Sequence, residues 1–263
     1  MDSGIKRIRG AWAALPLELV VGVIFFAHGL QKIGDPVGFA QRAIGGIPLF
    51  LSFLVIAAEF GGGLLLLTGL FVRLGALGHI CVMLVAISQV HWGYGLTGQG
   101  SFEFPLALLA AALALLILGG DPLSIDDNIS IALYRSRTAA ARSEVIDTAN
   151  PLVKAAGLIL ILAGVVLPIA RHYLGVADGT LSLVILIVAG VISLVVGGAV
   201  TAGKPWAYLP AFIVARLYLA ASTLLLFYVH YTWRGIVAMI VSLLVLASLR
   251  SARRGMIESA RVY

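Results

Sequence analysis

The sequence predicts an all-α, polytopic membrane protein with about eight transmembrane helices. Of its 263 residues, 61% are hydrophobic and only 11% are charged, and the mean hydropathy is +1.07. A soluble domain is roughly 45–50% apolar and ~25% charged. Eight apolar segments each approach the ~20 residues that a helix needs to cross a bilayer. The net charge of +6 comes from basic residues dispersed among these segments, which indicates contact with anionic lipid and argues against nucleic-acid binding.

The first four expected helices occupy the N-terminal half of the chain. The first follows a basic N-terminal stretch, as a signal peptide would, but its apolar run is long enough to span a membrane and lacks a small-residue cleavage site. It is therefore interpreted as a retained helix. The expected ranges are 12–32, 48–70, 74–92 and 103–119.

A polar segment, 121–150, separates the two halves. It begins within the run GGDPLSIDDN, which is typical of turns, and its remainder is predicted to be an interfacial helix or a cytoplasmic linker. The expected domains are 1–126, the linker 127–150, and 151–263. The C-terminal spans are expected at 152–174, 181–201, 206–229 and 233–249. Few residues separate the last two, so one long bent helix, giving seven spans, is the alternative.

The distribution of basic residues predicts the orientation. With eight spans and a cytoplasmic N-terminus, thirteen of the 18 lysines and arginines lie on the inner side and four on the outer side. This bias agrees with the positive-inside rule. We therefore expect an integral protein of the bacterial-type cytoplasmic (inner) membrane with both termini in the cytoplasm.

Several enzyme classes are excluded by missing motifs. Cys81 is the single cysteine, so neither an internal disulfide nor a CxxC thiol relay can form. No Walker loop and no GxGxxG after a strand are found, which argues against nucleotide binding.

Glu59 is a lone carboxylate in the apolar stretch AAEFGGGLLLLTGLFVRL at 57–74. It lies about eleven residues into the second span, or ~16 Å deep. A charge at such a depth costs ~2.5–3.5 kcal/mol on insertion scales, so it marks a functional hypothesis. Two partners are open. Arg216, at a similar depth in the seventh span, could pair with Glu59, or a protonated Glu59 could bond to His28 or another polar group of the first half.

Polar side chains gather at the expected outer ends of the first, third and fourth spans. His28, Lys32, His91 and Glu103 would form a pocket there, with Glu59 beneath it. Such a pocket would bring together groups that can act as general acids and bases. The alternative is that these are interfacial side chains that snorkel or pair with neighbours. Four of the five histidines fall near this face: His28, His91, His172 and His230.

Three segments resemble the DoxX family of small membrane proteins. They are FFAHGLQKI at 25–33, EFGGGLLLLTGLFVRLGAL at 59–77 and FEFPLALLAAALALLILGGDPLSID at 102–126, together with His91. The resemblance covers about residues 14–126. It implies a DoxX-like four-helix membrane bundle, to which this chain adds four C-terminal helices. It also implies a redox setting, such as the membrane subunit of a thiosulfate:quinone oxidoreductase or of another membrane oxidoreductase complex.

The favoured hypothesis is a quinone-linked membrane subunit that works with a partner protein. Glu59, His28 and His91 would act as catalytic groups, and His28, Lys32 and Glu103 would contact the quinone. In this hypothesis His and Lys donate to the quinone carbonyls, and Glu passes protons. The alternatives are a non-catalytic accessory or assembly subunit of a larger complex, and a transporter with a proton-linked Glu59. Haem between His28 and His91 is not favoured. No short-spaced ligand motif supports a metal, so no metal site is expected.

Overall fold

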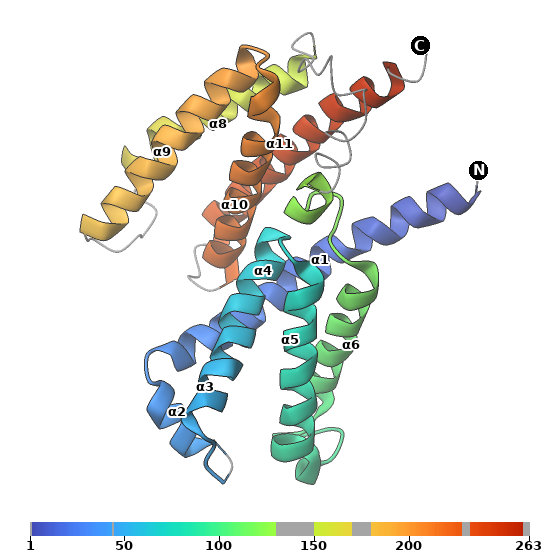
Figure 1. The fold of residues 1–263 in the computed structure, drawn as a ribbon, viewed down its shortest axis with the longest axis vertical. Coiled ribbons are helices and arrows are strands. Elements are labelled where there is room, and N and C mark those ends of the chain that lie inside the picture. Colours follow the sequence, from blue (N-terminus) through green and yellow to red (C-terminus); the bar gives the residue numbers. More distant parts are fainter. Residues whose placement is uncertain (1, 44, 130–149, 170–179, 228–231, 260–263) are drawn as a thin grey trace. The chain divides into compact units, whose positions relative to one another are not determined.

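The computed structural model describes residues 2–43, 45–129, 150–169, 180–227 and 232–259, and every regular element in these ranges is a helix (Figure 1). The chain divides into two compact units, Met1–Asp127 and Asn128–Tyr263, called unit 1 and unit 2 below. Among the described residues, six helical segments are long and apolar enough to cross a membrane, and two further apolar helices are shorter. These eight segments correspond to the eight expected spans, so the all-α membrane fold is confirmed.

Within the described residues, unit 1 contains four helical segments and one short connecting helix, and a further helical stretch begins at Ile125. The first segment is α1 (Asp2–Ile33), and the short α2 (Pro36–Arg42) follows it. The second segment joins α3 (Leu49–Ile56), the π-helix η1 (Ala57–Gly61) and α4 (Gly62–Thr68). The third joins α5 (Val72–Val85), the π-helix η2 (Ala86–His91) and the 3₁₀-helix η3 (Trp92–Tyr94). The fourth, α6 (Glu103–Leu118), has 16 residues, or about 24 Å, which is less than a typical hydrocarbon core of ~30 Å.

Unit 2 contains α8 (Pro151–Ile169), α9 (Thr180–Thr201), the 3₁₀-helix η6 (Pro205–Ala207), α10 (Tyr208–Phe227) and α11 (Thr232–Ser259). Helices α10 and α11 are separate and pack side by side (Figure 1). A Cβ atom added to Gly235 would lie 2.8 Å from the Cα atom of Leu226, so the two helices approach closely. One long bent helix is therefore wrong. Most of the predicted linker falls on 130–149, outside the described residues.

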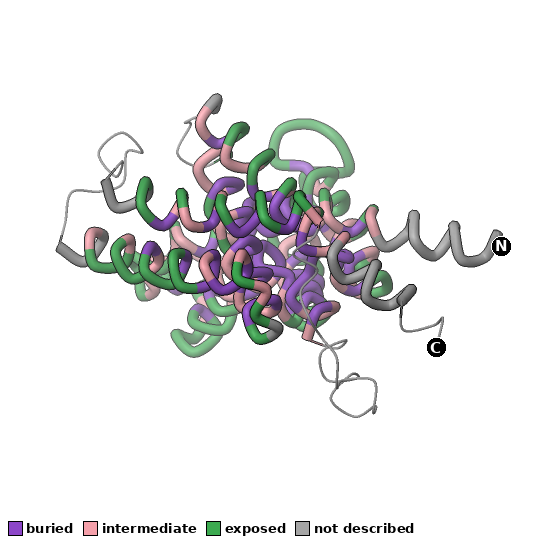
Figure 2. The backbone as a smooth tube through the Cα atoms, turned by 90° about the horizontal axis from the view of Figure 1, so that it is seen from above, coloured by how far each residue is buried: buried purple, intermediate pink, exposed green. Residues whose placement is uncertain are grey.

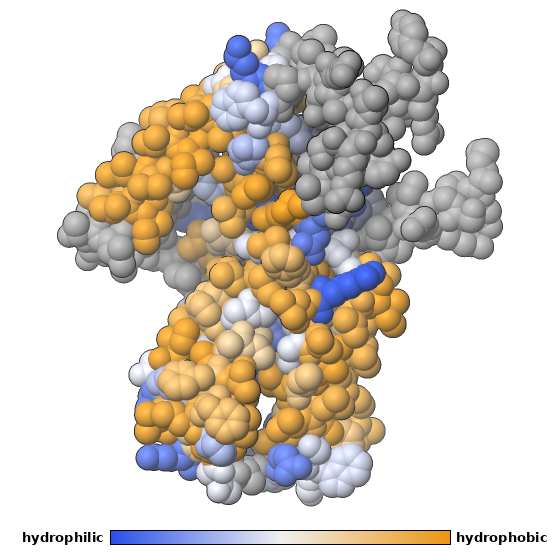
Figure 3. Space-filling model, in the orientation of Figure 1, coloured by the Kyte–Doolittle hydropathy of each residue, from blue (hydrophilic) through white to orange (hydrophobic). Residues whose placement is uncertain are grey.

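The outward faces of the helices are apolar. Buried residues lie where helices face one another, and exposed residues follow the outer surfaces (Figure 2). The exposed set includes large apolar side chains such as Phe50, Leu74 and Ile117, and apolar residues cover most of the described surface on the face that Figure 3 shows. Apolar exposure of this extent fits contact with lipid acyl chains.

The turn between α1 and α3 is fixed by short polar contacts. The Asp35 carboxylate accepts hydrogen bonds from the Gly38 backbone N–H at 2.8 Å and from the Arg42 guanidinium at 3.1 Å. These two interactions, the Gly38 bond above all, lower the pKa of Asp35. The Ser52 hydroxyl donates to the Pro36 carbonyl at 2.8 Å and ties α3 to α2. The end of α1, α2 and the start of α3 thereby lie at the same end of unit 1.

The opposite end of unit 1 is held by the segment that follows α6. The carboxylate of Asp126 accepts hydrogen bonds from the backbone N–H groups of Phe71 and Val72, at 2.8 and 3.0 Å. It therefore caps the N-terminus of α5 from 54 residues away in the chain. Glu18, which is fully buried in α1, accepts a hydrogen bond from the Asp121 N–H at 2.6 Å. The DPLSID part of the turn-forming run, residues 121–126, thus closes the unit around α1 and α5.

Helix α1 packs closely against η1 and α4 because glycines line the contact. A Cβ atom added to Gly29 would lie 2.3 Å from the Phe60 backbone nitrogen, and one added to Gly63 would lie 2.5 Å from the Phe26 nitrogen. Small residues permit such approaches between membrane helices. This contact brings the α1 residues His28 and Lys32 beside Glu59.

Replacing Gly29 with alanine should weaken this contact. The new methyl group would meet Phe60 backbone atoms, which cannot move as a side chain would, so α1 and η1 must separate. We expect a loss of about 1–3 kcal/mol in the free energy of unfolding, the usual cost of overpacking, measured by denaturation in detergent. Gly34→Ala is the matched control, because a Cβ at Gly34 meets nothing within 4 Å. Equal stabilities of the two variants would contradict the close contact.

Candidate functional site

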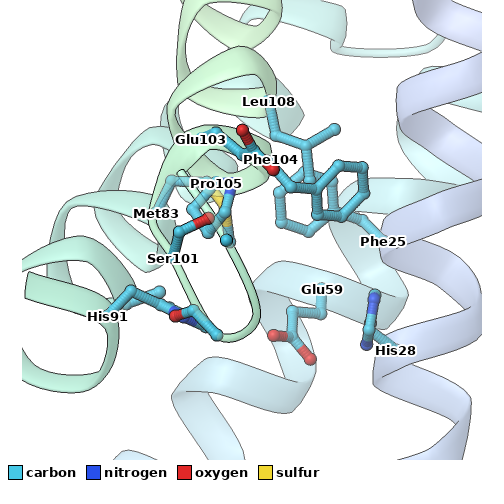
Figure 4. Close-up of a pocket in the computed structure, with 13 residues that line it drawn as sticks. Phe25, His28, Glu59, Met83, His91, Ser101, Glu103, Phe104, Pro105 and Leu108 are labelled. Carbon is cyan, nitrogen blue, oxygen red and sulfur yellow. The ribbon is translucent and has the colours of Figure 1, made fainter. Parts of the chain in front are cut away.

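A cavity of about 430 Å³ lies in unit 1 between α1, η1, α5, η2 and α6 (Figure 4). Small-molecule sites usually occupy roughly 300–1,000 Å³. Four ionisable side chains line it, each from a different helical segment: His28, Glu59, His91 and Glu103. The other lining side chains are mostly apolar: Phe25, Met83, Ala86, Phe104, Pro105 and Leu108, with Ser101 from the preceding loop.

Glu59 is the most buried of these four ionisable residues, at 4% exposed. Its Oε2 atom accepts a hydrogen bond from the Lys32 ammonium, so the two side chains form an ion pair between η1 and the end of α1. The Lys32 Nζ atom also lies 5.1 Å from the centre of the Phe39 ring, a favourable cation–π distance. Lys32 does not line the cavity itself. Its connection to the site is the ion pair with Glu59.

This ion pair bears on the two partners that the sequence left open for Glu59. Lys32 is a polar group of the first half, as in the second alternative, but its contact with Glu59 is an ion pair, whereas that alternative had a protonated Glu59. Arg216 is fully buried in α10, in unit 2. Its pairing with Glu59 stays a prediction.

His28 and Glu59 lie beside each other on one side of the cavity, and His91 lies on the other (Figure 4). His28 follows Phe25 by three residues and precedes Lys32 by four, so one face of α1 presents all three side chains. Because they share this face, the imidazole of His28 and the ammonium of Lys32 both lie beside Glu59.

His91 ends η2, and its ring is held by the loop that precedes α6. The Nδ1 atom lies 2.7 Å from the Gly100 carbonyl oxygen. A carbonyl oxygen can only accept, so Nδ1 carries the hydrogen and donates it. In the neutral ring, Nε2 is then an acceptor.

Glu103 is the first residue of α6 and is exposed at the rim of the cavity. The unpaired N–H groups of a helix N-terminus stabilise a negative charge there. Glu103 is thus a second carboxylate for the site, in a more polar setting than Glu59.

His79 is a buried residue next to the site that sequence reasoning did not select. Its ring stacks on Phe25, with the centroids 3.7 Å apart and the planes at 10°. It is 0% exposed, and neither ring nitrogen has a hydrogen-bond partner within the described part of the chain. Gly62 makes room for it, since a Cβ there would lie 2.8 Å from Nε2. In the sequence, His79 is a lone histidine in an apolar helix, and nothing but its depth indicated a role at the site.

The two π-helices were also not foreseen. Glu59 lies in η1 and His91 in η2, so two of the four ionisable lining residues stand in π-helical turns. Single π-turns within α-helices often occur at functional sites. Hydropathy does not detect them, because an extra residue in a turn leaves the apolar composition unchanged.

Some predicted residues are not placed. His172 and His230 lie outside the described residues. Within the described ranges, no group of three or more His, Cys, Asp or Glu side chains could hold a metal ion. The roles assigned to the four ionisable lining residues and Lys32, and haem as an alternative, stay predictions.

Comparison with known proteins places unit 1 in a sequence family. The DoxX family model matches residues 13–92. The chain is 33% identical over 103 residues to a protein of Bacillus subtilis (strain 168) named "Putative oxidoreductase CatD", and the match covers 38% of this chain and 76% of that protein. No solved structure matches the chain.

Proposed function

Because the chain belongs to the DoxX family of membrane proteins, we propose that it is the membrane subunit of a quinone-linked oxidoreductase system and acts with a partner protein. The name of the Bacillus relative supports a redox setting. The observation that carries the proposal is the cavity of unit 1, where four acid–base side chains surround a space with apolar walls.

The lining fits a quinone in size and polarity. Phe25, Met83 and Leu108 supply apolar walls suited to a flat ring, and a volume of about 430 Å³ is ample for such a ring. Polar groups on two sides of the cavity suit the two oxygens of the ring (Figure 4). A bound quinone supplies a carrier for two electrons and two protons.

The side chains of this chain would handle the protons, and a redox partner protein would exchange the electrons. Glu59 is positioned by Lys32, and His91 is oriented by the Gly100 carbonyl. Both present a proton acceptor to the cavity, at Oε1 of Glu59 and at Nε2 of His91. General acid–base groups held in place in this way typically contribute about 10²–10⁴-fold to a rate.

The proposed setting is the bacterial inner membrane, with both termini cytoplasmic. In that orientation α1 runs outward, and the cavity lined by His28, His91 and Glu103 lies toward the outer face. The support is the excess of lysines and arginines on the expected inner side.

Direct binding tests this proposal. Purified protein in lipid nanodiscs should bind duroquinone or its reduced form, duroquinol, saturably. Ala86→Trp should abolish the binding because the indole fills the cavity that Ala86 lines. Ala110→Trp is the matched control, since Ala110 is exposed on α6 and does not line the cavity. Absence of saturable binding of either form would favour an accessory or assembly subunit instead.

A further inference from the structure

Two hydrogen-bond donors beside the cavity are already used. The ammonium group of Lys32 is bound to Glu59 and stands outside the lining. The Nδ1–H group of His91 donates to the Gly100 carbonyl. Histidine and Lys32 were expected to donate to the carbonyls of a quinone, and the structure directs Lys32 and the Nδ1–H group of His91 toward other acceptors.

Among the side chains that line the cavity, the remaining hydrogen-bonding groups are mainly acceptors. Lys32 takes Oε2 of Glu59, which leaves Oε1, and both carboxylate oxygens of Glu103 are acceptors. Nε2 of His91 is a further acceptor in the neutral ring. The side-chain donors in the lining are an N–H group of the His28 ring and the hydroxyl of Ser101. Pro105, in the same wall, has no N–H to donate.

From this imbalance we infer that the cavity selects the reduced, dihydroxy form of the quinone pair. The inference rests on the proposed function and adds the preferred ligand. A hydroquinone carries two O–H donors, whereas a quinone offers only carbonyl acceptors. Carbonyls facing carboxylates leave polar groups unpaired, which costs more than a good hydrogen bond gains.

The arrangement of the acceptors also indicates where the two hydroxyls belong. Figure 4 places His91 on one side of the cavity and Glu59 with His28 on the other. A ring between them that donates to Oε1 of Glu59 and to Nε2 of His91 has its hydroxyls at opposite ends. The ligand class is therefore a para-hydroquinone.

The test compares three ligands of one shape, bound without oxygen to the protein in nanodiscs: duroquinol, duroquinone and duroquinol dimethyl ether. Duroquinol should bind about tenfold or more tightly than duroquinone, the size expected for hydrogen bonds to charged acceptors. The ether keeps the ring but lacks both O–H groups, so it should bind no better than duroquinone.

Glu59→Gln should bring the ratio of the two affinities close to one, because the amide adds donors and releases Lys32. Glu103→Gln should lower the ratio less, and Gln31→Ala, an exposed residue of α1 outside the lining, should leave it unchanged. Equal or tighter binding of duroquinone to the native protein would overturn the preference alone. A preference that survives in both Gln variants would do the same. Binding of neither form would overturn the proposed function as well.

Discussion

Replacing Lys32 with methionine is expected to lower the free energy of unfolding by about 3–5 kcal/mol, because the change leaves the Glu59 carboxylate buried without its partner. Methionine keeps the apolar stem, so the loss would report the charge and not the packing. Equilibrium denaturation in mixed detergent micelles, followed by circular dichroism, measures it.

Two variants separate the ion pair from a general effect of losing a cation. The double variant Lys32→Met, Glu59→Gln should recover most of the stability, since no buried charge then remains. Arg42→Met removes a cation whose ion pair with Asp35 is exposed, and exposed pairs contribute about 0–1 kcal/mol. Similar losses for Lys32→Met and Arg42→Met would show that the Lys32–Glu59 pair does not stabilise the fold.

Replacing Glu59 with glutamine should reduce turnover of the duroquinone pair by about 100-fold in the complex isolated with its partner, because the amide cannot take up or release the proton. Lys32 is partly exposed and can turn toward solvent when Glu59 loses its charge. The protein should therefore stay folded, and the loss should appear in kcat.

Gln31→Ala serves as the control for turnover, because Gln31 is the neighbour of Lys32 on α1 but does not line the cavity. Its turnover should equal that of the native complex. If Glu59→Gln also kept native turnover, Glu59 would be a structural partner of Lys32 with no part in proton transfer.

The helices could be predicted because membrane spans are specified by local composition. Each of the eight expected segments overlaps an observed helix or helical segment. Most boundaries differ by a few residues, but α1 begins ten residues before the expected first span and α11 ends ten residues after the expected last one. Four of the five selected site residues line one cavity, since the depth of each residue follows from its position along a span. The spacing of four residues between His28 and Lys32 also places them on one face of α1.

What could not be predicted depends on contacts between residues far apart in the chain. The interpretation of Lys32 as a group that contacts the ligand missed its bond to Glu59, 27 residues away. The cap that Asp126 provides to α5 joins two turns that no local pattern connects. The stacking of His79 on Phe25 needs α1 and α5 to meet at one depth. Composition and spacing describe each helix by itself, and these contacts arise only when the helices pack.

The π-helices η1 and η2 have a consequence for how such a site can change over time. An ordinary helix turns by about 100° per residue, so an added residue would rotate every side chain beyond it away from its partners. A π-turn absorbs the addition locally. The flanking helices keep the same faces toward the bundle, while the side chain inside the turn points in a new direction. Ancestral insertions and deletions at these two turns could therefore have altered the chemistry of the cavity and spared the scaffold that holds it.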